Sequence, residues 1–242
     1  MPLALTGGTL SAMLQEFGVS LKTIGLFAAI GTPYAIKFLW APIIDNVRIP
    51  FLGKRLGHRK SWLLLVQILL CEQIMFMAFQ DPSTDIWWVA AAAVVVATLS
   101  ATQDIIIDAY RIELLKAEEQ GHGSSAMVFG YRVGMLVSGA GALILADIEG
   151  WRITYLIMAI LVLSGIIAAV VIDSGKEDNI AMKQSVGAKA WIKTSVIDPF
   201  HDFSKNNGWF IILSFIVFFK LGDAFLGQMA NSFYLKTGFT KT

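Results

Sequence analysis

Residues 86–115 read IWWVAAAAVVVATLSATQDIIIDAYRIELL, and this stretch decides the fold. Residues 86–99 carry no charge, and their apolar side chains follow one another without the alternation of a half-buried strand. Four charged residues, from Asp104 to Glu113, then follow within ten positions. A helix rises about 1.5 Å per residue, so Asp104 lies about 27 Å from Ile86, close to the thickness of a hydrocarbon core. The stretch predicts a membrane-spanning helix that collects its charges at one end.

The composition places the chain among integral membrane proteins. Of its 242 residues, 56% are hydrophobic and 15% are charged, whereas soluble domains have about 45–50% apolar and about 25% charged residues. The net charge of +1 gives no reason to expect nucleic-acid binding. Cys71 is the lone cysteine, and the three histidines lack metal-ligand spacing. No nucleotide-binding or nucleophile motif is present, so we expect neither an enzyme nor a metal or cofactor site.

Continuous apolar runs recur along the chain, each long enough for a tilted transmembrane helix. The predicted spans are 20–44, 61–79, 86–110, 125–146, 151–172 and 208–235. Ahead of them, the first residues supply only part of a span, which ends near Gln15. The predicted fold is therefore all-α and membrane-embedded. It comprises a six-helix N-terminal bundle with a truncated first helix, followed by the start of a second bundle.

Charge in the loops predicts which side of the membrane each one faces. The segment 45–60 carries five Lys or Arg against one Asp, while 81–85 carries two acids and no base. The positive-inside rule places 45–60 in the cytoplasm, and alternation places 116–123 and 173–206 there too. We accordingly predict an N-terminal bundle (1–172), a cytoplasmic linker (173–206) and the first helix of a second bundle (207–242).

Ionisable side chains inside a span are costly, at about 2.5–3.5 kcal/mol near the helix centre, so each needs a partner or a function. Lys37 lies mid-span with Tyr34 and Trp40 one turn away on either side, and Arg132 lies about a third of the way into its own span. Lys220 and Asp223 are three residues apart near the middle of the last span. They either neutralise each other or form a substrate or proton site at the membrane midplane.

Asp104, Asp108 and Arg111 share one helix face, since they are spaced at i, i+4 and i+7, whereas Glu113 points elsewhere. Their predicted depth is the cytoplasmic edge, level with the basic loop 45–60. A conformational latch is the preferred interpretation, with proton relay through Asp104 and simple interfacial anchoring as alternatives.

The loop 45–60 is the second candidate for a gate. Asp45 ends one span, and a dense group of cations that includes Arg59 leads into the next. Ion pairs across such a tight connection can lock one conformation and release it in another. The alternative is that these cations only set the orientation of the chain in the membrane.

Several segments, in order along the chain, resemble one branch of the major facilitator superfamily. The loop APIIDNVRIPFLGKRLGHRK resembles the signature between the second and third helices of that superfamily, extended by an insertion. The segments that resemble the AmpG-type anhydromuropeptide permeases are LALTGGTL, SLKTIGLF, PYAIKFLWAPIID, SATQDIIIDAYRIELL, GYRVGMLVSGAGALILAD and KLGDAF.

The resemblance implies two six-helix bundles around a central cavity. It also implies proton-coupled uptake of GlcNAc-anhydro-MurNAc and its peptides across a Gram-negative inner membrane for cell-wall recycling. In similar proteins LALTGG lies inside the first helix and five more helices follow the seventh, so the chain is expected to be a fragment. Acetyl-coenzyme A transporters are a related branch that the residues alone do not separate.

These substrates carry lactyl and peptide carboxylates, which cations in the cavity would recognise. The candidate residues for the substrate anion are Lys37, Arg132 and Lys220, and those for the sugars are Tyr34 and Tyr131. Asp223 is the first candidate for proton coupling and Asp104 the second, while Asp45, Arg59, Asp108 and Arg111 form the expected cytoplasmic gate. Two other functions stay open: transport of another bulky anion, such as a coenzyme A ester or a folate-like compound, and a non-transporting sensor or degraded gene product.

Overall fold

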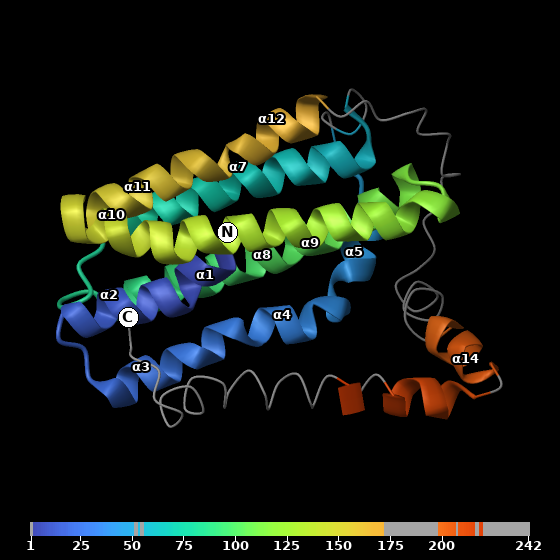
Figure 1. Cartoon of the computed structure of the whole chain (residues 1–242), viewed down its shortest axis with the longest axis horizontal. Helices are drawn as coiled ribbons and strands as arrows, with labels where there is room; N and C mark the ends of the chain where they lie inside the picture. Colours follow the sequence, from blue (N-terminus) through green and yellow to red (C-terminus); the bar gives the residue numbers. More distant parts are fainter. Residues whose placement is uncertain are drawn as a thin grey trace. The chain divides into compact units, whose positions relative to one another are not determined.

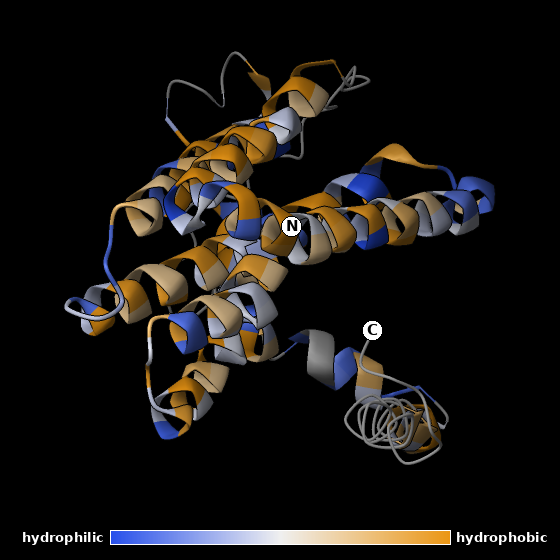
Figure 2. Cartoon of the chain, turned by 60° about the vertical axis from the view of Figure 1, so that its left-hand side comes forward, coloured by the Kyte–Doolittle hydropathy of each residue, from blue (hydrophilic) through white to orange (hydrophobic). Residues whose placement is uncertain are grey.

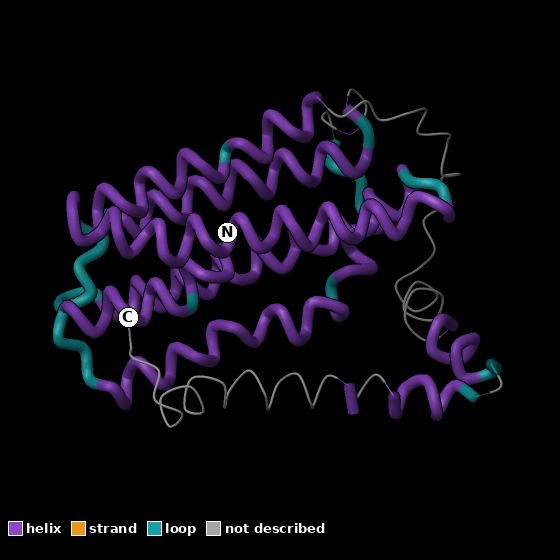
Figure 3. The backbone as a smooth tube through the Cα atoms, viewed as in Figure 1, coloured by secondary structure: helices purple, strands orange, loops and turns teal. Residues whose placement is uncertain are grey.

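The computed structural model describes residues 2–50, 53, 56–171, 198–206, 208–215 and 218–219. The chain divides into two compact units, Met1–Ile180 and Ala181–Thr242, and each is described by itself. Helices and their connections make up the described part, in which no strand occurs (Figure 3). The predicted all-α architecture is confirmed.

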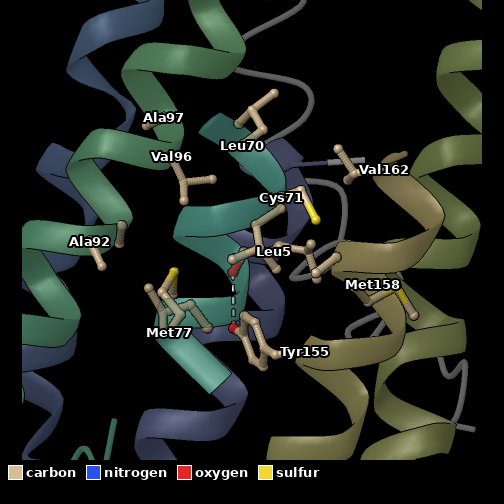
Figure 4. Packing of buried hydrophobic residues seen from close by; sticks show 14 of the residues in the cluster. Leu5, Leu70, Cys71, Met77, Ala92, Val96, Ala97, Tyr155, Met158 and Val162 are labelled. Atoms are coloured by element: carbon tan, nitrogen blue, oxygen red, sulfur yellow. Dashed lines mark hydrogen bonds between the residues drawn. The ribbon is translucent and has the colours of Figure 1, made fainter. Parts of the chain in front are cut away.

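The chain begins with a short, interrupted helix. Helix α1 (Pro2–Thr6) and helix α2 (Gly8–Glu16) meet at Gly7, and α2 ends one residue beyond the predicted end of the first span. The Tyr155 hydroxyl donates a hydrogen bond of 3.1 Å to the Leu5 carbonyl (Figure 4). This bond is buried and fixes α1 within the bundle.

The second predicted span, 20–44, is helical but broken. Its pieces are α3 (Leu21–Phe27), the 3-10 turn η1 (Ala28–Gly31), α4 (Thr32–Ile36), the 3-10 turn η2 (Lys37–Leu39) and α5 (Ala41–Asn46). Ser20 caps the first piece by accepting a hydrogen bond from the Thr23 backbone N–H. Pro33 and Pro42 each lie in the first turn of a new piece, where a missing N–H is tolerated. The prediction of one continuous helix here was wrong.

Four helical stretches are long and apolar enough to cross a membrane: His58–Ala78, Ile86–Leu114, Ala117–Glu149 and Trp151–Val171. The first two are α7 (His58–Ala78) and α8 (Ile86–Leu114). The third joins η3 (Ala117–Glu119), α9 (Gln120–Leu136), the π-turn η4 (Val137–Gly141) and α10 (Ala142–Glu149). The fourth joins α11 (Trp151–Val162) and α12 (Ser164–Val171). They correspond to four of the predicted spans, and Figure 2 shows hydrophobic residues along their lengths.

Helix α7 packs along both α8 and α11, and α8 also contacts α1, α4 and α5 (Figure 1). Leu70 and Ile74 of α7 are fully buried, as is Met158 of α11 (Figure 4 labels Leu70 and Met158). Ala93 and Ala97 of α8 are also fully buried, and such small side chains let neighbouring helices approach closely. This packing makes α8 the element around which the candidate site is built.

Short connections join the helices at the end of the bundle opposite the basic loop. Between α7 and α8 the Asp81 carboxylate accepts hydrogen bonds from the backbone N–H and the hydroxyl of Ser83. Both bonds favour the ionised carboxylate, so the pKa of Asp81 is lowered from its ordinary value. Gly150 turns the chain between α10 and α11 with a φ of +81°, a conformation that favours glycine.

The start of α11 is held at this same end by two side chains. The Trp151 indole N–H donates a hydrogen bond of 2.8 Å to the Glu16 carboxylate of α2. The Arg152 guanidinium lies 4.6 Å from the centre of the Phe79 ring. A small cavity of about 210 Å³ lies between these residues. The contacts join α2, the end of α7 and the start of α11 at one end of the bundle.

The second unit is described only in part. Helix α14 (Asp198–Ser204) is followed by helical residues 209–215. Lys205 donates to Asp202 at 2.9 Å, and this bond lowers the pKa of Asp202 from its ordinary value. Most of the predicted linker 173–206 and much of the predicted span 208–235 lie outside the described residues, and the predicted domain boundaries at 172 and 206 stay predictions.

Helix α12 packs closely against α7 at Gly165, so we expect this position to tolerate a larger side chain poorly. A Cβ added to Gly165 would overlap the side-chain amide of Gln67, which is 3% exposed. We expect Gly165→Ala to lower the free energy of unfolding by about 1–2 kcal/mol, because the buried amide must move. Thermal unfolding of the purified protein in detergent measures this. Gly25→Ala is the matched control, since a Cβ there meets no atom within 4 Å.

The double variant Gln67→Ala/Gly165→Ala tests the mechanism of that loss. Removing the Gln67 amide frees the space that the new methyl group needs, so the double variant should unfold at a higher temperature than Gly165→Ala alone. Equal unfolding temperatures for Gly165→Ala and Gly25→Ala would contradict the prediction.

Candidate functional site

A cavity of about 580 Å³ opens between α1, α4, α8 and α9. Its polar wall residues are Tyr34, Ser100, Gln103, Asp104, Asp108 and Tyr131. Four of these come from α8, where the spacing i, i+3, i+4 and i+8 places them on one side of the helix. Apolar wall residues such as Leu3, Ile107 and Met127 complete the site. A mixed wall of this kind, with a few polar groups among apolar ones, is typical of a small-molecule site.

Lys37 and Asp104 form an ion pair beside this cavity. The Lys37 ammonium lies 3.7 Å from the Asp104 carboxylate, and the two side chains are 34% and 39% exposed. Lys37 belongs to η2, at the break in the second span, while Asp104 belongs to α8. The pair neutralises two charges that would be costly if each stood alone in a membrane. Its partial exposure leaves it accessible to another charged group that enters the cavity.

The structure brings the two candidate sugar-binding tyrosines into one cavity. Tyr34 and Tyr131 both line it, from α4 and α9 respectively. The Tyr34 hydroxyl is buried beside Ser100 and forms no hydrogen bond of good geometry with the described residues. It is therefore a polar group that a ligand can engage.

The other candidate cations for the substrate are not brought to this cavity. Arg132 follows Tyr131 in the sequence, but its side chain is exposed and it is not a wall residue. Lys220 lies outside the described residues, as does the candidate proton-coupling residue Asp223. Of the three predicted anion-binding residues, Lys37 is the one that the described structure places beside the cavity.

The shared charged face of α8 is present, and part of it lines the cavity. Asp104 and Asp108 line the same cavity as Tyr34, so they are not separated from the expected substrate region. The sequence estimate counted residues from Ile86 and could not show that the second span brings Lys37 to Asp104. Arg111 lies 3.8 Å from Asp108 and also donates a hydrogen bond to the Ser124 hydroxyl of α9.

A second cluster joins three helix ends at the end of the bundle near the basic loop. Arg59, in the first turn of α7, donates to Asp45 of α5 at 2.7 Å. It also donates to both carboxylate oxygens of Glu113, near the end of α8, at 2.7–3.2 Å. The Arg59 side chain is 8% exposed, whereas Asp45 and Glu113 are 46% and 41% exposed. We refer to Asp45, Arg59 and Glu113 as the Arg59 cluster.

The Arg59 cluster agrees only in part with the sequence prediction. The two gate candidates Asp45 and Arg59 form an ion pair with each other, but the partner on α8 is Glu113 and not the face that carries Asp108 and Arg111. Beside the cluster, the His58 imidazole donates a hydrogen bond of 2.9 Å to the Ile44 carbonyl. Sequence reasoning missed both Glu113 and His58. An acidic residue in the last turn of a span, opposite a loop with five cations, is the signal that could have identified Glu113.

Within the described ranges, no three His, Cys, Asp or Glu side chains gather in a way that would hold a metal ion. The carboxylates of the cavity pair instead with Lys37 and Arg111. The arrangement suits recognition of a charged, polar solute at these residues.

Comparison with known proteins then assigns the family. The family model of the Major Facilitator Superfamily matches residues 1–240. The chain belongs to the major facilitator superfamily. Together with the four apolar spans, this membership makes it a multi-pass protein of the inner membrane.

Curated relatives within this superfamily include proteins named for transport. The chain is 44% identical to the anhydromuropeptide permease of Escherichia coli strain K12, over 98% of this chain and 46% of the relative. It is 39% identical to AmpG 4 of Rickettsia conorii, over 100% of this chain and 58% of that protein. An uncharacterised protein of Haemophilus influenzae is 33% identical over 100% of this chain and 55% of its own length. The chain thus spans about half the length of the curated relatives it matches.

Proposed function

We propose that this chain takes part in proton-coupled import of anhydromuropeptides, meaning GlcNAc-anhydro-MurNAc and its peptides, for cell-wall recycling. The observation that carries the proposal is the 44% identity to an anhydromuropeptide permease over 98% of the chain. The predicted site residues are spread over that matched length, from Tyr34 to Asp223, so the resemblance is not confined to one motif.

The cavity supports a substrate of this chemistry. Tyr34 and Tyr131 supply hydroxyl groups and ring faces for sugar, and Ser100 and Gln103 supply further hydrogen-bonding groups. A volume of about 580 Å³ is within the range of small-molecule sites. A cavity of this volume holds either one sugar ring of the disaccharide or a short peptide. The rest of the substrate would extend through the opening of the cavity.

Lys37 is the proposed anion-binding residue. A substrate carboxylate would compete with Asp104 for the Lys37 ammonium, since the two side chains lie 3.7 Å apart and are partly exposed. Protonation of Asp104 would release Lys37 for the substrate, which links proton binding to substrate binding. Arg132, Lys220 and Asp223 keep their predicted roles as hypotheses, with Asp223 as the first candidate for proton coupling and Asp104 as the second.

The Arg59 cluster is the proposed cytoplasmic latch. It holds the ends of α5 and α8 against the start of α7, on the side where the loop 45–60 is predicted to face the cytoplasm. Asp108 and Arg111 join α8 to the start of α9 through Ser124. Both sets of contacts would have to loosen or shift when the bundle changes conformation.

Uptake by the complete gene product tests the proposal. Inside-out or right-side-out vesicles that contain the protein are given radiolabelled GlcNAc-anhydro-MurNAc, with and without an imposed proton gradient. We expect gradient-driven accumulation that a protonophore abolishes. Uptake of acetyl-coenzyme A in place of the muropeptide would assign the protein to another bulky anion. Uptake of neither compound would contradict the proposal.

A further inference from the structure

We propose that Trp40 and Thr102 are positioning residues that hold Lys37 in place for binding a substrate carboxylate. The proposal rests on the proposed function of Lys37, and it names residues that sequence reasoning did not assign to the site. The Trp40 indole N–H donates a hydrogen bond of 3.0 Å to the Thr102 hydroxyl, from the second span to α8. The ion pair between Lys37 and Asp104 joins the same two segments, three and two residues away.

The backbone around Lys37 explains why an external contact is needed. Helix α4 ends at Ile36, the 3-10 turn η2 covers Lys37–Leu39, and α5 begins at Ala41. The regular ladder of helical hydrogen bonds is therefore interrupted on both sides of Lys37. Pro42 adds to the interruption, since it has no N–H to donate. A residue at such a break is fixed less by its own helix than one in the middle of α7 or α8.

The Thr102 hydroxyl is well placed to accept a hydrogen bond from the Trp40 indole. Thr102 is 7% exposed, and its hydroxyl donates its own proton to the Thr98 carbonyl at 2.8 Å. That bond directs an oxygen lone pair at the Trp40 indole, which is a donor only. The two bonds together satisfy a buried hydroxyl inside the bundle. The contact joins residues 62 positions apart, so it determines how the broken span lies against α8.

The register set by this contact determines where the Lys37 ammonium lies. The Trp40 backbone N–H bonds to the Lys37 carbonyl at 3.3 Å, so the two residues belong to one tight turn. Loss of the indole bond would let that turn move relative to Asp104 and the cavity. A displacement of about 1 Å at a binding group can cost much of its contribution.

Transport kinetics in the complete gene product test the proposal. Thr102→Val removes the hydroxyl and keeps the shape, whereas Thr102→Ser keeps the hydroxyl. We expect Thr102→Val and Trp40→Phe each to raise the KM for GlcNAc-anhydro-MurNAc about fivefold, as expected for one lost hydrogen bond, with kcat changed less than about twofold. Thr102→Ser should stay within about twofold of the wild-type KM. In a Lys37→Ala background, Thr102→Val should have no further effect on KM.

A second measurement is independent of the substrate. In the complete gene product with Cys71 and every cysteine outside these 242 residues replaced by Ser, Lys37→Cys gives one thiol whose reaction rate with a methanethiosulfonate reagent can be followed. Thr102→Val should raise that rate at least threefold, and Thr102→Ser should not. If muropeptide uptake fails but this rate responds, the proposed function is wrong and the positioning role stands. An unchanged thiol rate, or an equal KM effect of Thr102→Val with and without Lys37, overturns the positioning role.

Discussion

Replacing Arg59 with alanine is expected to abolish active uptake and to destabilise the N-terminal bundle by about 3 kcal/mol. Arg59 is the buried member of the Arg59 cluster, and it bonds two carboxylates that come from different helices. Its removal leaves Asp45 and Glu113 as like charges without their shared counter-ion. The expected cost is at the low end for a broken buried pair, because both carboxylates are partly exposed to solvent.

Graded substitutions separate charge from geometry in this cluster. Arg59→Lys keeps the charge but cannot reproduce the bidentate fork to Glu113 and the bond to Asp45 at once, so we expect an intermediate loss. Glu113→Gln keeps an acceptor and should cost less than Arg59→Ala. Lys22→Ala is the matched control, since Lys22 is an exposed cation for which no ion pair is present in the described structure. Thermal unfolding in detergent measures stability, and vesicle uptake measures turnover.

The effect on kcat distinguishes a latch that controls the conformational cycle from a contact that only stabilises the fold. If the cluster controls the conformational cycle, the milder variant Glu113→Gln lowers kcat several-fold while the KM for substrate changes little. If the cluster only stabilises the fold, kcat per folded molecule stays at the wild-type value. Wild-type unfolding temperature and uptake in Arg59→Ala would refute both roles.

The membrane helices were predictable because their signal is local and strong. The runs 61–79 and 86–110 have uninterrupted apolar sequence, and the structure forms α7 and α8 there. The second span was predicted with the right position but the wrong continuity. Pro33 and Pro42 were present in the sequence, yet hydropathy alone does not show whether a proline kinks a helix or divides it into separate turns.

The site was less predictable because its contacts join distant positions. The bond between Asp45 and Arg59 spans 14 residues across one loop, and the charge pattern was enough to name both residues as gate candidates. The bond between Arg59 and Glu113 spans 54 residues, and it was missed because the face argument followed Asp104 and Asp108. Spacing along one helix gives the residues that share its face, but not the helix that each face meets.

Asp104→Asn is expected to uncouple substrate movement from the proton gradient. Asparagine has the size of aspartate but cannot bind and release a proton. Gradient-driven accumulation of GlcNAc-anhydro-MurNAc should fall at least tenfold, while exchange of preloaded for external substrate should continue within about threefold of wild type, as expected for a lost protonation step. Asp223→Asn is the companion variant. If it uncouples transport and Asp104→Asn does not, the proton site lies in the last predicted span.

The proposed roles of Lys37 and Asp104 in substrate and proton binding must be distinguished from their neutralisation of each other. Either single change, Lys37→Ala or Asp104→Asn, leaves one charge without its partner in a span, at a cost of about 2.5–3.5 kcal/mol. The double variant Lys37→Ala/Asp104→Asn removes both charges, so it should be expressed and should unfold more like wild type than either single variant does. Expression and unfolding temperature therefore report the neutralising role of the pair.

Uptake by the double variant then decides between the two roles. If Lys37 and Asp104 only neutralise each other, the double variant recovers accumulation together with stability. If Lys37 binds the substrate carboxylate and Asp104 carries the proton, stability recovers while accumulation does not, and the KM remains as high as in Lys37→Ala. Both charges lie beside one cavity at 3.7 Å, where a proton on the carboxylate and an anion on the ammonium compete for the same contact. That competition is the physical reason to expect the second result.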